Sequence, residues 1–193
     1  METLTNFLAE YKTITLIFHG IGVAVGIGAA TVTDILFFKF LKDKKISHKE
    51  SETINALSPI IWVALVVIIF SGLALYLPGM EYFNESSKFL LKMVIVGVIV
   101  CNGAFLNFFI SPKLGHISFG DWHKHKEGEM HTVRKVSFAL GGISIISWYS
   151  AFILGSLRSI PFSFSDGILF YILVLAIGII GSQFFEYYIR HKA

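Results

Sequence analysis

Five apolar stretches, each about as long as a membrane span, constrain the fold more than any other feature of this sequence. About 20 apolar residues in a helix cross the hydrocarbon core of a bilayer. None of the stretches alternates apolar and polar residues as a half-buried strand does. The sequence therefore predicts an all-α fold, a polytopic integral membrane bundle of five transmembrane helices that forms one domain over residues 1–193. The predicted spans are residues 13–38, 56–77, 89–110, 136–157 and 167–188.

The composition agrees with a membrane environment. Hydrophobic residues make up 54% of the chain and charged residues only 15%, whereas soluble domains carry about 25% charged residues. This composition excludes a soluble enzyme, a disordered chain and a nucleic-acid-binding module, because too little polar surface is present to cover a water-soluble core. We expect the lipid bilayer as partner and no nucleic acid, since the basic residues flank the apolar stretches. Cys101 is the only cysteine, so the chain forms no internal disulfide.

The first stretch lies where a signal peptide would lie, but it differs from one in two respects. Glu2 and Glu10 precede it together with Lys12, so the leading segment is not basic. Its apolar run is also about twice as long as the core of a signal peptide. We therefore expect it to remain as a membrane helix.

Lysine and arginine are distributed unevenly over the connections between the stretches. Twelve of the 16 lie after the first stretch, after the third stretch or at the C-terminus, and the others lie in the alternate connections. Because basic residues accumulate on the cytoplasmic side, the sequence predicts an N-terminus outside and a C-terminus in the cytoplasm. We expect a multi-pass protein of a prokaryotic-type plasma (inner) membrane.

Small residues recur at helical spacing in four of the stretches, and such faces allow helices to approach closely in lipid. The first stretch places between His19 and Asp34 the residues Gly22, Gly26, Ala30 and Thr33. The faces of the third, fourth and fifth stretches are Met93, Gly97, Cys101 and Ala104; Ser137, Gly141, Ser144, Trp148, Ala151 and Gly155; and Gly178, Gly181 and Ser182. We interpret all four faces as helix contacts.

His19 and Met93 are the candidate cofactor ligands. Both lie about one and a half turns below the outer surface, on the first and third stretches. A buried imidazole is either a neutral group hydrogen-bonded to a carbonyl or a serine, or the ligand of haem b or a metal, with a methionine thioether as a second axial ligand. Lys88 and Lys92 lie on the same side, where they either reach lipid headgroups or pair with an anionic group such as a haem propionate.

An inner polar cluster is predicted near the cytoplasmic surface, because ionisable residues inside spans are costly and are usually paired or functional. Two interpretations are open: ion pairs at helix ends with Arg134 or Lys135, or part of a path for a proton or cation. The residues of this cluster are Asp34, Asn102, Gln183 and Glu186.

A histidine-rich connection follows the third stretch. His123 and His125 are two residues apart and, with His131, have the donor chemistry of a transition-metal site. The spacing matches no standard zinc pattern, so a solvated loop at the membrane surface is the other interpretation.

The first three stretches resemble two families of small bacterial membrane proteins. His19 is followed by Gly20, by a run of glycine and small residues, and then by Asp34 and a basic connection. This pattern is similar to the copper-resistance D family and the membrane-bound protoporphyrinogen oxidase family. The resemblance implies a bundle of four to eight helices and, for the oxidase family, haem bound through such a histidine, which is His19 here.

Three functions are compatible with these features, and whether the chain is an enzyme stays open. The first is a small redox membrane protein that binds haem or a metal through His19. The second is a small transporter or channel subunit that uses Asp34 and Glu186. The third is a structural or assembly protein without catalysis. A membrane redox partner or a second copy of the chain is the expected protein partner.

The charge distribution gives a testable topology. A cysteine introduced at Ser47 should be shielded from an impermeant thiol reagent in intact cells, because the connection after the first stretch is predicted to be cytoplasmic. A cysteine at Ser87 should react. Reversed labelling would overturn the orientation, and labelling of both sites would contradict the number of spans.

Overall fold

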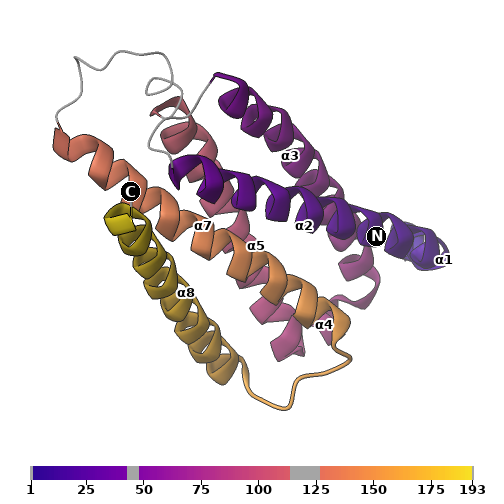
Figure 1. Cartoon of the computed structure of the whole chain (residues 1–193). Helices are drawn as coiled ribbons and strands as arrows, with labels where there is room; N and C mark the ends of the chain where they lie inside the picture. The colour runs from indigo at the N-terminus through magenta and orange to yellow at the C-terminus, as the bar shows by residue number, and fades with distance from the viewer. Residues whose placement is uncertain (1, 43–47, 114–126, 193) are drawn as a thin grey trace.

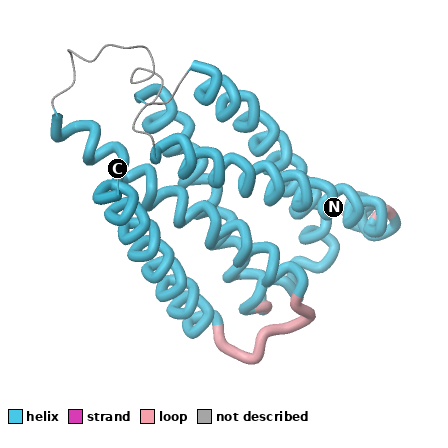
Figure 2. Tube along the Cα trace, in the orientation of Figure 1, coloured by secondary structure: helices cyan, strands magenta, loops and turns pink. Residues whose placement is uncertain are grey.

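The computed structural model describes residues 2–42, 48–113 and 127–192 (Figure 1). These residues are helical apart from short connections and contain no strand (Figure 2). The α-helices are α1 (Glu2–Glu10), α2 (Lys12–Lys42), α3 (His48–Tyr76), α4 (Met80–Glu85), α5 (Ser87–Phe105), α7 (Glu127–Ser156) and α8 (Phe164–Lys192). A 3-10 turn covers Leu77–Gly79, and a π-helical segment covers Leu106–Ile110.

The predicted all-α membrane bundle is confirmed as a fold class. Five helices in the described chain are long and apolar enough to cross a membrane. They coincide with the predicted spans but are longer: α3 begins at His48 rather than at residue 56, and α7 at Glu127 rather than at residue 136. A helix of 31 residues, such as α2, is about 46 Å long, so its ends extend beyond a hydrocarbon core of about 30 Å.

The helix ends have recognisable caps. Ser86 precedes α5, and its Oγ accepts a hydrogen bond from the Phe89 backbone N–H. Ser163 precedes α8, where its Oγ accepts from the Asp166 N–H and donates to the Asp166 carboxylate. Such caps satisfy amide groups that have no partner within the helix, so each serine marks the start of its helix.

The long helices form a layered bundle with α7 near its middle. α2 packs along α3, while α7 contacts α2, α5 and α8 (Figure 1). The term basic end is used here for the end of the bundle at which α2 and α8 end and at which α3 and α7 begin. The predicted cytoplasmic connections start at this end. The structure contains no membrane, so the orientation stays a prediction.

The outside of the bundle is apolar. On α8, Ile177, Ile180 and Phe184 are each 69–70% exposed, and α2 and α3 carry similar residues on their outer faces. Water would make such a surface costly, whereas lipid tails cover it without penalty. The exposed side chains therefore support the interpretation of these helices as membrane spans.

The interior contains two apolar clusters. One lies in the middle of the bundle and includes Leu65, Ile95 and Trp148. The other consists of Phe37, Phe40, Ile110 and Phe138, packed against Phe38 and Leu106. The two clusters leave a polar region between α2, α3, α5 and α7, which is described in the next subsection.

The small face of α2 is a helix contact, as predicted. Gly22, Gly26 and Ala30 are buried. A Cβ at Gly22 would lie 3.1 Å from Ile68 Cγ1 of α3, and one at Gly26 would lie 2.7 Å from Trp148 Cη2 of α7. Glycine is required at position 26 because the indole ring occupies the space that any side chain would fill.

Two of the other predicted faces need correction. Gly97 and Cys101 of α5 are exposed and Met93 is 43% exposed, so that face looks outward; Leu91, Ile95 and Ile99 form the buried face instead. On α8, a Cβ at Gly181 would meet nothing within 4 Å, whereas Gly178 lies against Ile146 and close to Gly142 of α7. Lipid accepts glycine as readily as a neighbouring helix does, which is why spacing alone misassigned these positions.

Replacing Gly26 by leucine should destabilise the bundle, because the side chain would overlap the ring of Trp148. Overpacking of this kind costs about 1–3 kcal/mol or more. The midpoint of thermal unfolding in detergent measures the effect. Gly28→Leu is the matched control, since a Cβ there meets nothing within 4 Å. Equal tolerance of leucine at both positions would contradict the observed α2–α7 contact.

Candidate functional site

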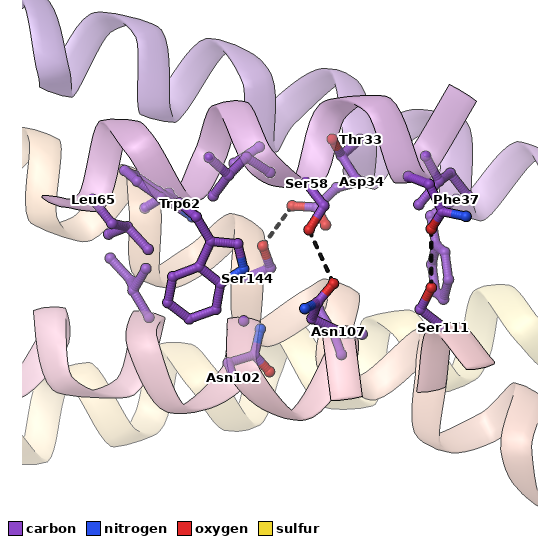
Figure 3. A pocket seen from close by; sticks show the side chains of 18 of the residues that line it. Thr33, Asp34, Phe37, Ser58, Trp62, Leu65, Asn102, Asn107, Ser111 and Ser144 are labelled. Atoms are coloured by element: carbon purple, nitrogen blue, oxygen red, sulfur yellow. Dashed lines mark hydrogen bonds between the residues drawn. The ribbon is translucent and has the colours of Figure 1, made fainter. Parts of the chain in front are cut away.

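A cavity lies inside the bundle between α2, α3, α5 and α7, and the π-helical segment forms part of its wall (Figure 3). Its volume is about 100 Å³, enough for several waters or one small solute. Most of the wall is apolar, with polar side chains at a few points. The cavity extends toward the basic end, where Ser51 and Ser111 line it.

Asp34 is the one acidic residue among the described residues that line the cavity. It lies on the buried face of α2 and is 5% exposed. Ser144 of α7 donates a hydrogen bond of 2.7 Å from its Oγ to Asp34 Oδ2. Among residues 3–40, 49–113 and 132–188, whose side chains the structure describes, no basic side chain forms an ion pair with Asp34. A carboxyl group in this setting is costly unless another group compensates it.

Asn102 of α5 is the second polar residue in the cavity wall and is 7% exposed. Its Nδ2 donates to the Leu140 backbone carbonyl over 3.2 Å. Its Oδ1 is buried and has no hydrogen-bond partner among the described residues. Buried acceptors are almost always satisfied by protein or ordered water, so this oxygen is an exception within the described chain.

The helices on both sides of the cavity are irregular. Pro59 lies inside α3 and has no N–H, so the Asn55 carbonyl loses its helical partner. On the opposite side α5 continues into the π-helical segment Leu106–Ile110. Irregular backbone within membrane helices occurs where it lines a cavity, and π-helical segments are frequent at functional sites.

Two hydrogen bonds join these irregular regions across the cavity (Figure 3). Ser58 Oγ donates to Asn107 Oδ1 over 3.0 Å, and Ser111 Oγ donates to Asn55 Oδ1 over 3.2 Å. They hold α3 to the end of α5 at the basic end.

The predicted inner polar cluster divides into two groups. Asp34 and Asn102 line the cavity. Glu186 of α8 instead forms an ion pair with Arg134 of α7, and their side chains are 2% and 12% exposed. Gln183 Nε2 donates to the Lys135 carbonyl over 2.9 Å. The ion-pair interpretation therefore holds for Glu186, and the α7–α8 contact contains both members of this second group.

The Arg134–Glu186 pair makes a testable prediction about stability. Glu186→Leu alone should destabilise the bundle by about 3–5 kcal/mol, because it leaves the arginine buried without its partner. Combining it with Arg134→Met should recover most of the loss. Unfolding in detergent across the double-mutant cycle measures the coupling. Additive losses would contradict a coupled structural pair.

His19 has a hydrogen-bond partner on α3. Its Nδ1 lies 2.9 Å from Ser71 Oγ, and its ring faces Gly72. Lys92 of α5 is close enough for its charge to act on His19, whereas Met93 is on the exposed face of α5. A serine partner was one of the two interpretations of His19. Haem or metal binding by His19 and Met93 stays a prediction, which the Soret absorbance of protein purified without added haem would test.

The candidate metal ligands of the histidine-rich connection lie outside the described side chains. His123 and His125 lie outside the described residues, and so does the side chain of His131. The described side chains contain no group of three or more histidine, cysteine or acidic residues that could hold a metal ion.

Three cavity residues on α3 were missed by sequence reasoning: Asn55, Ser58 and Trp62. Asn55 precedes the predicted span, and Ser58 sits at its start, where a polar residue is unremarkable. The available signal was the spacing: Asn55, Ser58 and Trp62 are three and four residues apart and therefore share one face of a helix.

Comparisons with protein-family models, curated proteins and solved structures find no match to this chain. The resemblance of the first three stretches to the copper-resistance D and protoporphyrinogen oxidase families therefore stays an expectation. The assignment of function depends on the geometry of the cavity.

Proposed function

We propose that this chain is a small plasma-membrane protein of the transporter or channel-subunit class, which binds a cationic solute in the cavity at Asp34. One observation carries the proposal: a buried carboxyl group faces a cavity inside a membrane bundle and has no basic partner in the described chain. Ionisable residues at such positions mark pathways for ions or substrates in membrane proteins.

The electrostatics of the wall favour a positive charge. Among the described residues that line the cavity, the polar ones are one acid, three asparagines and several hydroxyl residues, and none is a lysine, arginine or histidine. Ser144 donates to Oδ2 of Asp34, and no described side chain donates to the other oxygen, Oδ1. A bound cation would compensate the carboxylate as Arg134 compensates Glu186.

The lining residues support access from the basic end. Trp148 lines the cavity and packs on Gly26 of α2, so α2 and α7 are in close contact at the other end of the cavity. Toward the basic end the lining residues Ser51 and Ser111 are polar.

The reactivity of Asp34 tests the proposal. A hydrophobic carbodiimide modifies carboxyl groups inside membrane proteins, and peptide mass spectrometry locates the adduct. With purified protein, at least one cation from a panel of alkali-metal and alkylammonium chlorides should slow modification of Asp34. The rate should fall about ten-fold when the cation is about ten times above its Kd, because a bound cation covers the carboxylate.

Uptake by liposomes extends the test from binding to transport. The cation that protects Asp34 should accumulate in liposomes that contain the wild-type protein, and Asp34→Asn should remove this uptake. Asp166→Asn is the matched control, because Asp166 is exposed at the start of α8 and lies outside the cavity. An Asp34 that does not react, or that reacts at one rate with every cation, would contradict the proposed function.

A further inference from the structure

The cavity wall contains aromatic rings as well as the carboxyl group. Trp62 of α3 and Phe37 of α2 line it (Figure 3), and so does Trp148 of α7. Trp148 and Phe37 are only 6% and 7% exposed, so their rings are held in place by the surrounding core. Tryptophan is the side chain with the strongest cation–π attraction, and carboxylates with aromatic rings recognise alkylated ammonium groups.

We propose that the solute is a small organic ammonium ion, whose charge lies at Asp34 and whose alkyl groups lie against Trp62 and Trp148. This inference rests on the proposed binding of a cation at Asp34 and names the class of that cation. It requires one ion with an N–H donor, a positive charge and a few carbon atoms.

The oxygen atoms of the wall are poorly arranged for an inorganic cation. The amide oxygens of Asn55 and Asn107 already accept hydrogen bonds from serines, and the Thr33 hydroxyl donates to the Ala29 carbonyl over 2.8 Å. A hard metal cation must replace most of its water shell with oxygen ligands. The mostly apolar wall offers few of these, whereas it suits the methyl and methylene groups of an organic cation.

The remaining carboxylate oxygen matches an ammonium ion. Asp34 Oδ1 receives no hydrogen bond from a described side chain. An ammonium N–H can donate to this oxygen while its positive charge compensates the carboxylate. A neutral solute could donate to the same oxygen but would leave the charge of Asp34 uncompensated.

The volume of the cavity limits the size of the ion. It is about 100 Å³, whereas pockets for drug-sized ligands have about 300–1,000 Å³. An ion with a few heavy atoms, such as trimethylammonium, is therefore the appropriate probe. Tetrabutylammonium carries the same charge but is too large, and tert-butanol has nearly the shape of trimethylammonium without the charge.

Protection of Asp34 from the carbodiimide distinguishes these possibilities. Trimethylammonium should protect at a concentration at least about ten-fold lower than sodium does, a difference typical of one added cation–π contact with a desolvated ring. Tetrabutylammonium and tert-butanol should give no protection. Protection by tetrabutylammonium or tert-butanol equal to that by trimethylammonium would overturn the inference.

Substitution of Trp62 tests the aromatic wall. Trp62 is partly buried, whereas Trp148 supports the α2–α7 contact, so Trp62 is the safer position to change. Trp62→Leu should raise the half-protecting concentration of trimethylammonium about three- to thirty-fold and leave that of sodium unchanged. Trp62→Phe keeps a ring and should lose less. An equal loss for both ions, or none for trimethylammonium, would contradict a cation–π role.

The outcomes separate this inference from the proposed function. If sodium or potassium protects Asp34 as well as trimethylammonium or better, the organic class is wrong and the cation site stands. If no cation protects, both proposals fail.

Discussion

The contact between Gly26 of α2 and Trp148 of α7 sets how closely these two helices approach beside the cavity. The indole ring lies so close to Gly26 that a Cβ there would be 2.7 Å from it. Helices in lipid gain no hydrophobic energy from associating, so such close packing is the main attraction between them. Toward the basic end, Phe38 occupies the space beside Gly141 in the same way. Asp34 lies between Gly26 and Phe38 on α2, so the cavity that it lines is located between these two close contacts.

Glycines that allow close contacts between helices can be recognised in a sequence, as α2 illustrates. Its glycines are repeated four residues apart and its outer positions, such as Val25, are large, so the buried face was predictable. On α5 the same reasoning failed, because Gly97 and Cys101 face outward while large residues such as Ile95 form the interior. Both faces of a membrane helix are apolar, and so composition does not separate them.

The site was predictable in part for a related reason. Asp34 and Asn102 are polar residues in apolar stretches, and their cost in lipid identified them. The sequence could not show which partners the four polar residues of the inner cluster would have. Only the packing of α7 on α8 brings Arg134 to Glu186, and only the packing of four helices brings Ser144 to Asp34. Asn55 and Ser58 of α3 could not be identified in this way, because helix ends commonly carry polar residues.

Glu186 and Asp34 solve the same electrostatic problem in different ways. Removing a carboxylate from water costs several kcal/mol even after the protein relaxes. For Glu186 this cost is offset by the guanidinium of Arg134, which is part of the same chain, so the ion pair holds α7 to α8. For Asp34 the described chain supplies one hydroxyl group and leaves a cavity beside it. The cation that we propose for Asp34 is not tethered and could enter and leave, which is the property that a binding or transport site requires and a structural ion pair lacks.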